Sequence, residues 1–194
     1  TAMVNYAVML EAGVEVPVNY EEAIKYLKMA IDKGNSSAMY SYAVMLKEGE
    51  GTPVNYEEAI KYLKMAIDKD NSSAMYNYAC MLEEGEGIPV NYEEAIKYYS
   101  MAIQNGNIRA LTRVAGMLCS GKGFPVDYEK AIQFYKIAIS KGDTDAMIDY
   151  SYMLQTGEGV PVNYEEAIKY YKMAIDRGNV VAMNNYAYML ENGM

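Results

Sequence analysis

The sequence contains no histidine and no tryptophan, and it has only two cysteines among its 194 residues. Without histidine there is no Ser-His-Asp or Cys-His catalytic pair, no histidine-ligated zinc and no imidazole acid–base chemistry. Two cysteines are too few for a four-thiolate metal site or a disulfide framework. These absences predict a protein that is not an enzyme and that holds no metal and no cofactor.

Basic residues are also scarce, with 17 Lys and Arg against 26 Asp and Glu and a formal net charge of −9. Nucleic-acid backbones and anionic membrane surfaces are bound by clusters of Lys and Arg, so we expect no nucleic-acid partner. The sequence has no apolar run of about 18 residues, which predicts no membrane insertion. No signal peptide is visible, and together with two thiols this favours a cytoplasmic location.

The sequence is strongly periodic. Proline occurs five times at intervals of 36 residues, and a tyrosine follows each proline three residues later. A fixed period of this length predicts an array of structural repeats. The expected repeats are residues 2–37, 38–73, 74–109, 110–145 and 146–181, with a half repeat at 182–194. We expect one array over residues 1–194 that is a segment of a longer protein.

Each repeat has the pattern of two helices. In repeat 1, apolar residues between Tyr20 and Ile31 recur at the spacing of one helical face. Asn19 and Glu22 fit a capping box at its start, and Gly34 is expected to end it in the left-handed conformation. A first helix is expected from about Ala2 to Ala12. One such hairpin cannot bury its apolar faces alone, so we expect the hairpins to stack.

The repeated pattern A-M-x-x-Y-A-x-M-L-x-x-G-x-G-x-P-V-N-Y-E-E-A-I-K-Y-Y-K-M-A-I-D-x-G-N resembles the Sel1-like repeat (SLR), a relative of the tetratricopeptide repeat. The tetratricopeptide unit has 34 residues, and the two extra residues here fall in the G-x-G-x-P turn. The resemblance covers the whole chain. It implies an all-α, right-handed superhelical α/α solenoid of about eleven helices and a non-enzymatic adaptor role. Cys80 and Cys119 lie in different repeats, unlike the disulfide in each repeat of the family's cysteine-rich branch.

Three positions of the first helix vary from repeat to repeat, and their spacing of three to four residues places them on one stripe. The first set is Val4, Tyr40, Tyr76, Thr112, Ile148 and Asn184; the second is Val8, Val44, Cys80, Gly116, Tyr152 and Tyr188; the third is Glu11, Lys47, Glu83, Cys119, Gln155 and Glu191. In the tetratricopeptide family the matching positions line a concave groove that binds peptides. The resemblance therefore implies a groove with an aromatic and aliphatic floor and an acidic border.

This stripe allows two interpretations. In the first, it recognises an extended or helical peptide with apolar anchors and basic flanks, for which tyrosine is well suited. In the second, these are only the relaxed, solvent-facing positions of a solenoid. A further stripe of methionines such as Met39 is interpreted as core packing, because it follows the repeat period.

Repeat 4 differs from the others, since it alone carries a net positive charge. Arg109 and Arg113 are hypothesised to hold an acidic group of a ligand. Gly116 would open a pocket in the groove floor, and Lys130 breaks the capping box. Drift in one copy of a duplicated repeat explains the same facts, so both interpretations stay open.

The preferred function is a protein–protein interaction scaffold that binds a protein or peptide ligand of basic and apolar character on its concave face. The predicted partner-binding residues are Val4, Val8, Glu11, Tyr40, Val44, Lys47, Tyr76, Cys80, Glu83, Arg109, Thr112, Arg113, Gly116, Ile148, Tyr152, Gln155 and Tyr188. The alternative is a structural array that acts through end-to-end self-association. A small-molecule-binding or hydrolytic role is disfavoured by the missing histidine and repeat disulfides.

Overall fold

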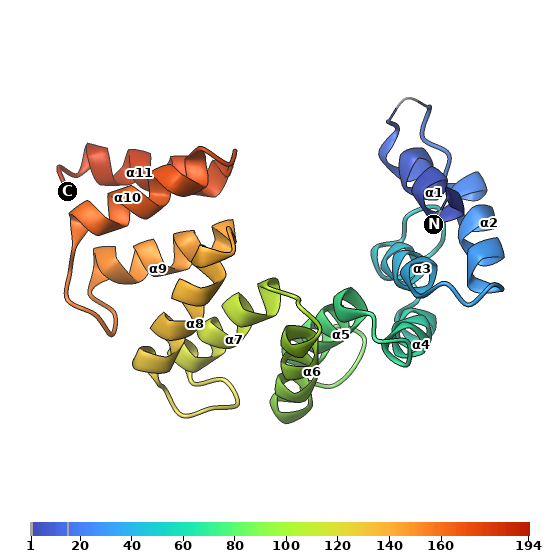
Figure 1. Cartoon of the computed structure of the whole chain (residues 1–194), viewed down its shortest axis with the longest axis horizontal. Helices are drawn as coiled ribbons and strands as arrows, with labels where there is room; N and C mark the ends of the chain where they lie inside the picture. The colour runs from blue at the N-terminus through green and yellow to red at the C-terminus, as the bar shows by residue number, and fades with distance from the viewer. Residues whose placement is uncertain (1, 15) are drawn as a thin grey trace. The chain divides into compact units, whose positions relative to one another are not determined.

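The computed structural model describes residues 2–14 and 16–194, and this part of the chain contains eleven α-helices and no strand (Figure 1). The predicted all-α repeat fold is thereby confirmed. Odd-numbered helices are the first helices of the repeats and even-numbered helices are the second. Their bounds are α1 Ala2–Ala12, α2 Tyr20–Ile31, α3 Ser36–Glu48, α4 Tyr56–Ile67, α5 Ser72–Glu84, α6 Tyr92–Gln104, α7 Arg109–Ser120, α8 Tyr128–Ser140, α9 Thr144–Thr156, α10 Tyr164–Ile175 and α11 Val180–Glu191.

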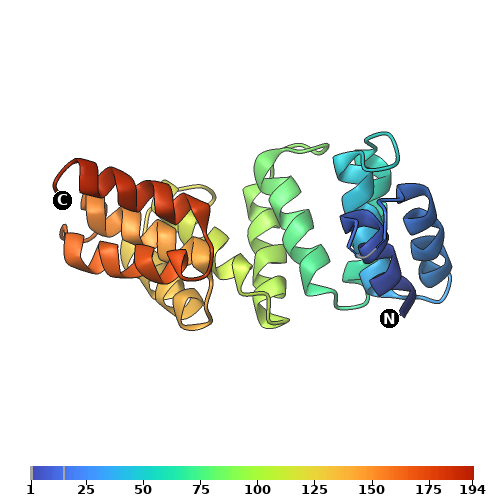
Figure 2. The ribbon, with the colours of Figure 1, turned by 90° about the horizontal axis from the view of Figure 1, so that it is seen from above.

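The helices form two compact units, α1–α6 in the chain up to Asn107 and α7–α11 from Ile108 onward. Within each unit, a first helix packs against the second helix of its own repeat in a hairpin (Figure 2). The second helix then packs against the first helix of the next repeat, as α2 does on α3 and α8 on α9. Apolar faces are thus buried by stacking.

The second helices begin with the predicted asparagine caps. The backbone N–H of Glu22 donates to Oδ1 of Asn19 at 3.0 Å, and the Asn19 side-chain amide donates to Glu22 Oε2 at 3.4 Å. In repeat 4, Asp127 accepts from the Lys130 backbone N–H at 2.9 Å. The lysine therefore removes only the return interaction of the box, and α8 keeps its cap.

A left-handed residue follows each second helix. α2 ends at Ile31, and Gly34 adopts φ +75° while its N–H donates to the Ile31 carbonyl at 2.7 Å. The N–H of Asn35 donates to the Ala30 carbonyl at 3.1 Å, which completes a Schellman motif. In repeat 2, Asp70 holds the glycine position with φ +56°.

Tyrosines and lysines that recur in most repeats join the helices within each unit. The rings of Tyr6 and Tyr26 meet edge to face with centroids 5.0 Å apart, and this pair recurs in later hairpins. Lys28 Nζ lies 5.2 Å from the ring centroid of Tyr42 in the next repeat. The same contact recurs at Lys64–Tyr78, Lys136–Tyr150 and Lys172–Tyr186.

Small residues and methionines fill the interior. Ala23 and its counterparts in the other repeats are fully buried, which allows the helices to approach closely. Met39, Met75 and Met147 are buried too, whereas Met3 is half-buried and Met183 on α11 is exposed, so the methionine stripe is core in repeats 2, 3 and 5. Gly51 has φ +67°, and a Cβ atom there would collide with Tyr20 of the preceding repeat. The G-x-G-x-P turn therefore packs directly on its neighbour.

Candidate functional site

The predicted partner-binding residues lie on the first helices, but the structure divides them between interior and surface. Val4, Tyr76, Glu83 and Thr112 are buried. Exposed members are Val8, Arg109, Tyr152 and Tyr188, and the rest are half-buried. The four buried members therefore offer little surface to a partner, and partner binding by the stripe stays a prediction.

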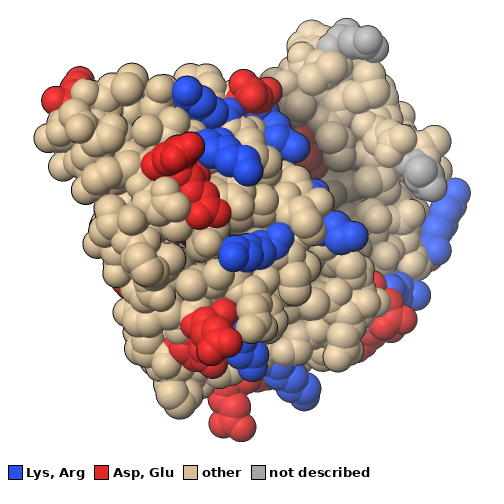
Figure 3. All heavy atoms as spheres, turned by 60° about the vertical axis from the view of Figure 1, so that its left-hand side comes forward, with Lys and Arg blue, Asp and Glu red and all other residues tan. Residues whose placement is uncertain are grey.

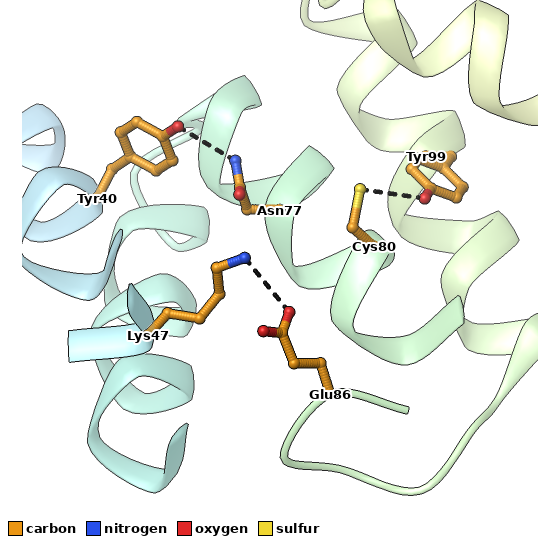
Figure 4. A network of polar contacts seen from close by, with 6 residues as sticks. All are labelled: Tyr40, Lys47, Asn77, Cys80, Glu86 and Tyr99. Atoms are coloured by element: carbon orange, nitrogen blue, oxygen red, sulfur yellow. Dashed lines mark hydrogen bonds and ion pairs between the residues drawn. The ribbon is translucent and has the colours of Figure 1, made fainter. Parts of the chain in front are cut away.

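In the α1–α6 unit, several of these side chains hold successive repeats together (Figure 4). The Asn77 side-chain amide donates to the Tyr40 hydroxyl at 3.1 Å, across from α5 to α3. Lys47 Nζ lies 3.3 Å from Glu86 Oε2 in the turn that follows α5. Residues predicted to contact a partner thus also connect one repeat to the next.

Tyr99 on the second helix α6 contacts two residues of this stripe, although the sequence analysis did not predict it as a site residue. The Tyr99 hydroxyl donates to Glu83 Oε2 at 2.7 Å and lies 3.3 Å from Cys80 Sγ. Tyr171 likewise donates to Gln155 Oε1 at 3.2 Å. A usable signal exists in the sequence, because repeats 1 and 2 have leucine at this position and a buried tyrosine hydroxyl requires a polar partner.

Repeat 1 lacks a tyrosine hydroxyl at this position. Leu27 is the counterpart of Tyr99, and Oε1 of Glu11 is buried without a hydrogen-bond partner in the described part of the chain. Burial raises the pKa of Glu11, and the charge of Glu50 raises it further. Lys47 and Glu86 occupy the equivalent places one repeat later and form an ion pair instead.

The α7–α11 unit contains a pocket of about 390 Å³ on the stripe. It is lined by Gly116 and Cys119 of α7, Tyr135 of α8, Ile148, Asp149, Tyr152 and Met153 of α9, Glu158 of the following turn and Asn185 of α11. Gly116, Ile148 and Tyr152 were on the predicted stripe. Asp149, Tyr135, Glu158 and Asn185 were not predicted, because they come from three helices and a turn and no pattern along a single helix relates them.

The pocket changes the acid–base properties of its lining. Asp149 is exposed to the pocket, yet the surrounding protein removes enough water to raise the pKa of its carboxyl to about 6. The charges of Asp145 and Asp143 raise it further, while Arg113 and the Tyr135 hydroxyl lower it. Burial also raises the pKa of the Cys119 thiol to about 11, and the thiol is therefore protonated at neutral pH.

Arg109 and Arg113 do not line this pocket. Arg109 is exposed at the start of α7, and Arg113 acts on the carboxylate of Asp149 through its charge. The charged residues of the lining are Asp149 and Glu158, which are both acidic. The hypothesis that these arginines hold an acidic ligand group stays a prediction, separate from the pocket.

Among the described residues, no group of three or more Cys, Asp or Glu side chains is arranged to hold a metal ion. None of the described helices has the length and apolarity needed to cross a membrane. On the side shown in Figure 3, Lys and Arg lie among Asp and Glu instead of forming a separate basic patch. The two cysteines are thiols and form no disulfide.

The Sel1 repeat model matches the chain over residues 1–35, 36–71, 72–107, 108–143, 144–179 and 180–194. These matches have the predicted period, framed one or two residues earlier, and they run through both units. No curated protein sequence matched the chain.

Solved structures share the fold. A Sel1 repeat protein from Oxalobacter formigenes aligns with a TM-score of 0.88 and 25% identity over 100% of this chain and 77% of that one. A protective antigen of uropathogenic Escherichia coli with an SLR fold aligns at 0.78 and 26% identity, covering 99% and 41%. An immunity protein from Pseudomonas aeruginosa aligns at 0.71 and 21% identity, covering 93% and 67%, and supports the fold alone.

Proposed function

Since this chain belongs to the Sel1 repeat family, whose members are generally protein-interaction scaffolds, we propose that it binds a peptide or protein partner on the exposed part of its first-helix stripe. The family fold is a non-catalytic scaffold, and we extend that property to this chain. The absence of histidine agrees with such a role.

The observation that carries this proposal is a pair of exposed aromatic side chains. Tyr152 on α9 and Tyr188 on α11 occupy the same repeat position and are 52% and 55% exposed. Exposed valines such as Val54, by contrast, recur in every turn, where the side chain packs on a glycine such as Gly49. The scaffold accounts for the valines but not for the tyrosines. Tyrosine provides a large contact area at low entropic cost.

The test is a selection from a displayed peptide library on the immobilised 194-residue chain. Tyr152→Ala and Tyr188→Ala should each weaken the binding of a selected peptide by about tenfold or more, because each removes an aromatic anchor. Tyr164→Ala is the matched control, because Tyr164 is 40% exposed on a second helix. Equal binding by all three variants would contradict the proposed surface.

A second candidate function is end-to-end self-association through α11. Leu190 is 59% exposed, whereas its counterparts Leu10, Leu46, Leu82, Leu118 and Leu154 are at most 3% exposed. Val180, Val181 and Met183 of the same helix are exposed as well. Burial of such apolar area is the usual driving force for association.

Sedimentation over a concentration series tests this second function. Leu190→Lys should abolish any dimer or higher species, while Ile137→Lys should not, because Ile137 is 47% exposed on α8 and does not belong to α11. A chain that stays monomeric at all concentrations excludes self-association and leaves the peptide-binding proposal in place.

A further inference from the structure

The pocket of the α7–α11 unit exists because one side chain is missing. At the repeat position of Gly116, the other repeats carry Val8, Val44, Cys80, Tyr152 and Tyr188. An added Cβ atom at Gly116 would meet only the Tyr135 hydroxyl, at 3.7 Å. The space is therefore open above the glycine. Its volume of about 390 Å³ is at the lower end for ligand pockets, which suits a single long side chain.

The walls of the pocket have two chemical characters. Ile148, Met153 and the ring of Tyr152 provide apolar and aromatic surface. Asp149 and Glu158 provide two carboxyl groups, and Asn185 adds an amide. An aromatic face beside carboxylates is the arrangement that binds a planar cation, which can stack and donate hydrogen bonds together.

The electrostatics around Asp149 also favour a cation. Asp143 and Asp145 add negative charge, and each raises the Asp149 pKa more than Arg113 lowers it. Tyr135 and the Cys119 thiol are neutral at pH 7, because burial raises the pKa of both. Bound positive charge would therefore relieve repulsion among carboxylates that the protein itself leaves only partly compensated.

On the basis of the function proposed above, we infer that this pocket binds the guanidinium group of an arginine side chain in the partner. The guanidinium stacks on Tyr152 and donates hydrogen bonds to the carboxylate of Asp149, while Glu158, beyond the far end of α9, adds negative charge to the pocket. Gly116 provides the space for the side chain. The pocket thus gives the scaffold its specificity for a basic residue.

Binding is coupled to the loss of a proton. A cation favours the ionised form of Asp149, so affinity rises as pH passes upward through the free pKa. With a free pKa of about 6, roughly one Asp149 in ten is ionised at pH 5. Affinity at pH 5 should therefore be about tenfold lower than at pH 7.5.

The experiment uses N-acetyl-arginine amide as the probe and the whole chain as the protein, followed by amide chemical shifts in NMR titrations. N-acetyl-citrulline amide is the isosteric neutral control. We expect saturable shifts near Gly116 and Asp149 with arginine, the pH dependence given above, and no saturation with citrulline. Equal binding of both probes, or arginine shifts elsewhere only, would overturn the inference.

Variants make the test specific. Asp149→Asn should reduce affinity at pH 7.5 at least fivefold and remove its pH dependence, and Gly116→Val should block the probe with the residue found in repeats 1 and 2. Asp176→Asn is the control, because Asp176 is an exposed carboxylate outside the pocket. Unchanged NMR spectra outside the pocket show that each variant is folded. Unaltered binding by Asp149→Asn refutes the site.

The two proposals fail in different ways. If the selected peptides contain no arginine and Tyr152→Ala still weakens their binding, the scaffold function stands and the arginine pocket is refuted. Binding of the arginine probe with no selectable peptide would retain the pocket and refute the peptide-binding function.

Discussion

Replacing Tyr99 with phenylalanine removes one hydroxyl group from the interior of the α1–α6 unit. The Tyr99 side chain is fully buried, and its hydroxyl donates to the carboxylate of Glu83 at 2.7 Å. Hydrogen bonds to charged groups contribute about 1.5–3 kcal/mol, and bonds between neutral groups about 0.5–1.5 kcal/mol. Tyr171 donates to the neutral amide oxygen of Gln155 at 3.2 Å. Tyr99→Phe should therefore cost about 2 kcal/mol and Tyr171→Phe about 1 kcal/mol.

The comparison requires local measurements of stability, because stacked repeats need not unfold in one step. Native-state hydrogen exchange of α5 and α6 reports the free energy of opening around Tyr99, and exchange of α9 and α10 reports that around Tyr171. Urea unfolding followed by circular dichroism gives the corresponding global values. The two substitutions are matched, since both occur at the same repeat position and remove the same group.

A double-mutant cycle with Glu83→Gln then isolates the pair. The cost of Tyr99→Phe should fall toward that of Tyr171→Phe once the acceptor is a neutral amide. The reasoning is refuted if Tyr99→Phe costs no more than Tyr171→Phe in the original chain, or if the cycle shows no coupling between Tyr99 and Glu83.

Three further substitutions test local features. Asp70→Gly should raise the free energy of unfolding by about 0.5–1 kcal/mol in urea, because Asp70 holds a left-handed φ of +56°; a loss of stability would contradict the assignment of strain. Gly116→Ala should raise it by about 0.5–1 kcal/mol in thermal melting, because a helix interior favours alanine and the Cβ has room; destabilisation would mean that the pocket wall is closed to a methyl group. The raised pKa of Glu11, due first to burial and then to Glu50, makes its ionised form unfavourable in the folded state. Glu11→Gln should therefore be more stable than the original chain in urea at pH 7 and should lose that advantage below the ordinary pKa of 4.5, for example at about pH 3.5; an advantage that persists there would refute the titration of Glu11 as its cause.

The sequence by itself determined the architecture, because the signals that specify it are local and recur. Asn19 caps a helix through residues three positions away, and Gly34 closes one through its own φ. A period of 36 residues then places like faces in register, which predicts the stacking of hairpins and the burial of Met39, Met75 and Met147. None of these steps requires knowledge of a distant contact.

Only the tertiary structure decided which variable positions are available to a partner. Tyr76 and Tyr152 are both tyrosines on the predicted stripe, yet Tyr76 is buried and Tyr152 is 52% exposed. The pocket at Gly116 depends in the same way on Asp149 and Asn185, which come from two later first helices. Exposure and pKa depend on what neighbouring repeats bring to the same place, and a pattern along one helix does not contain that information.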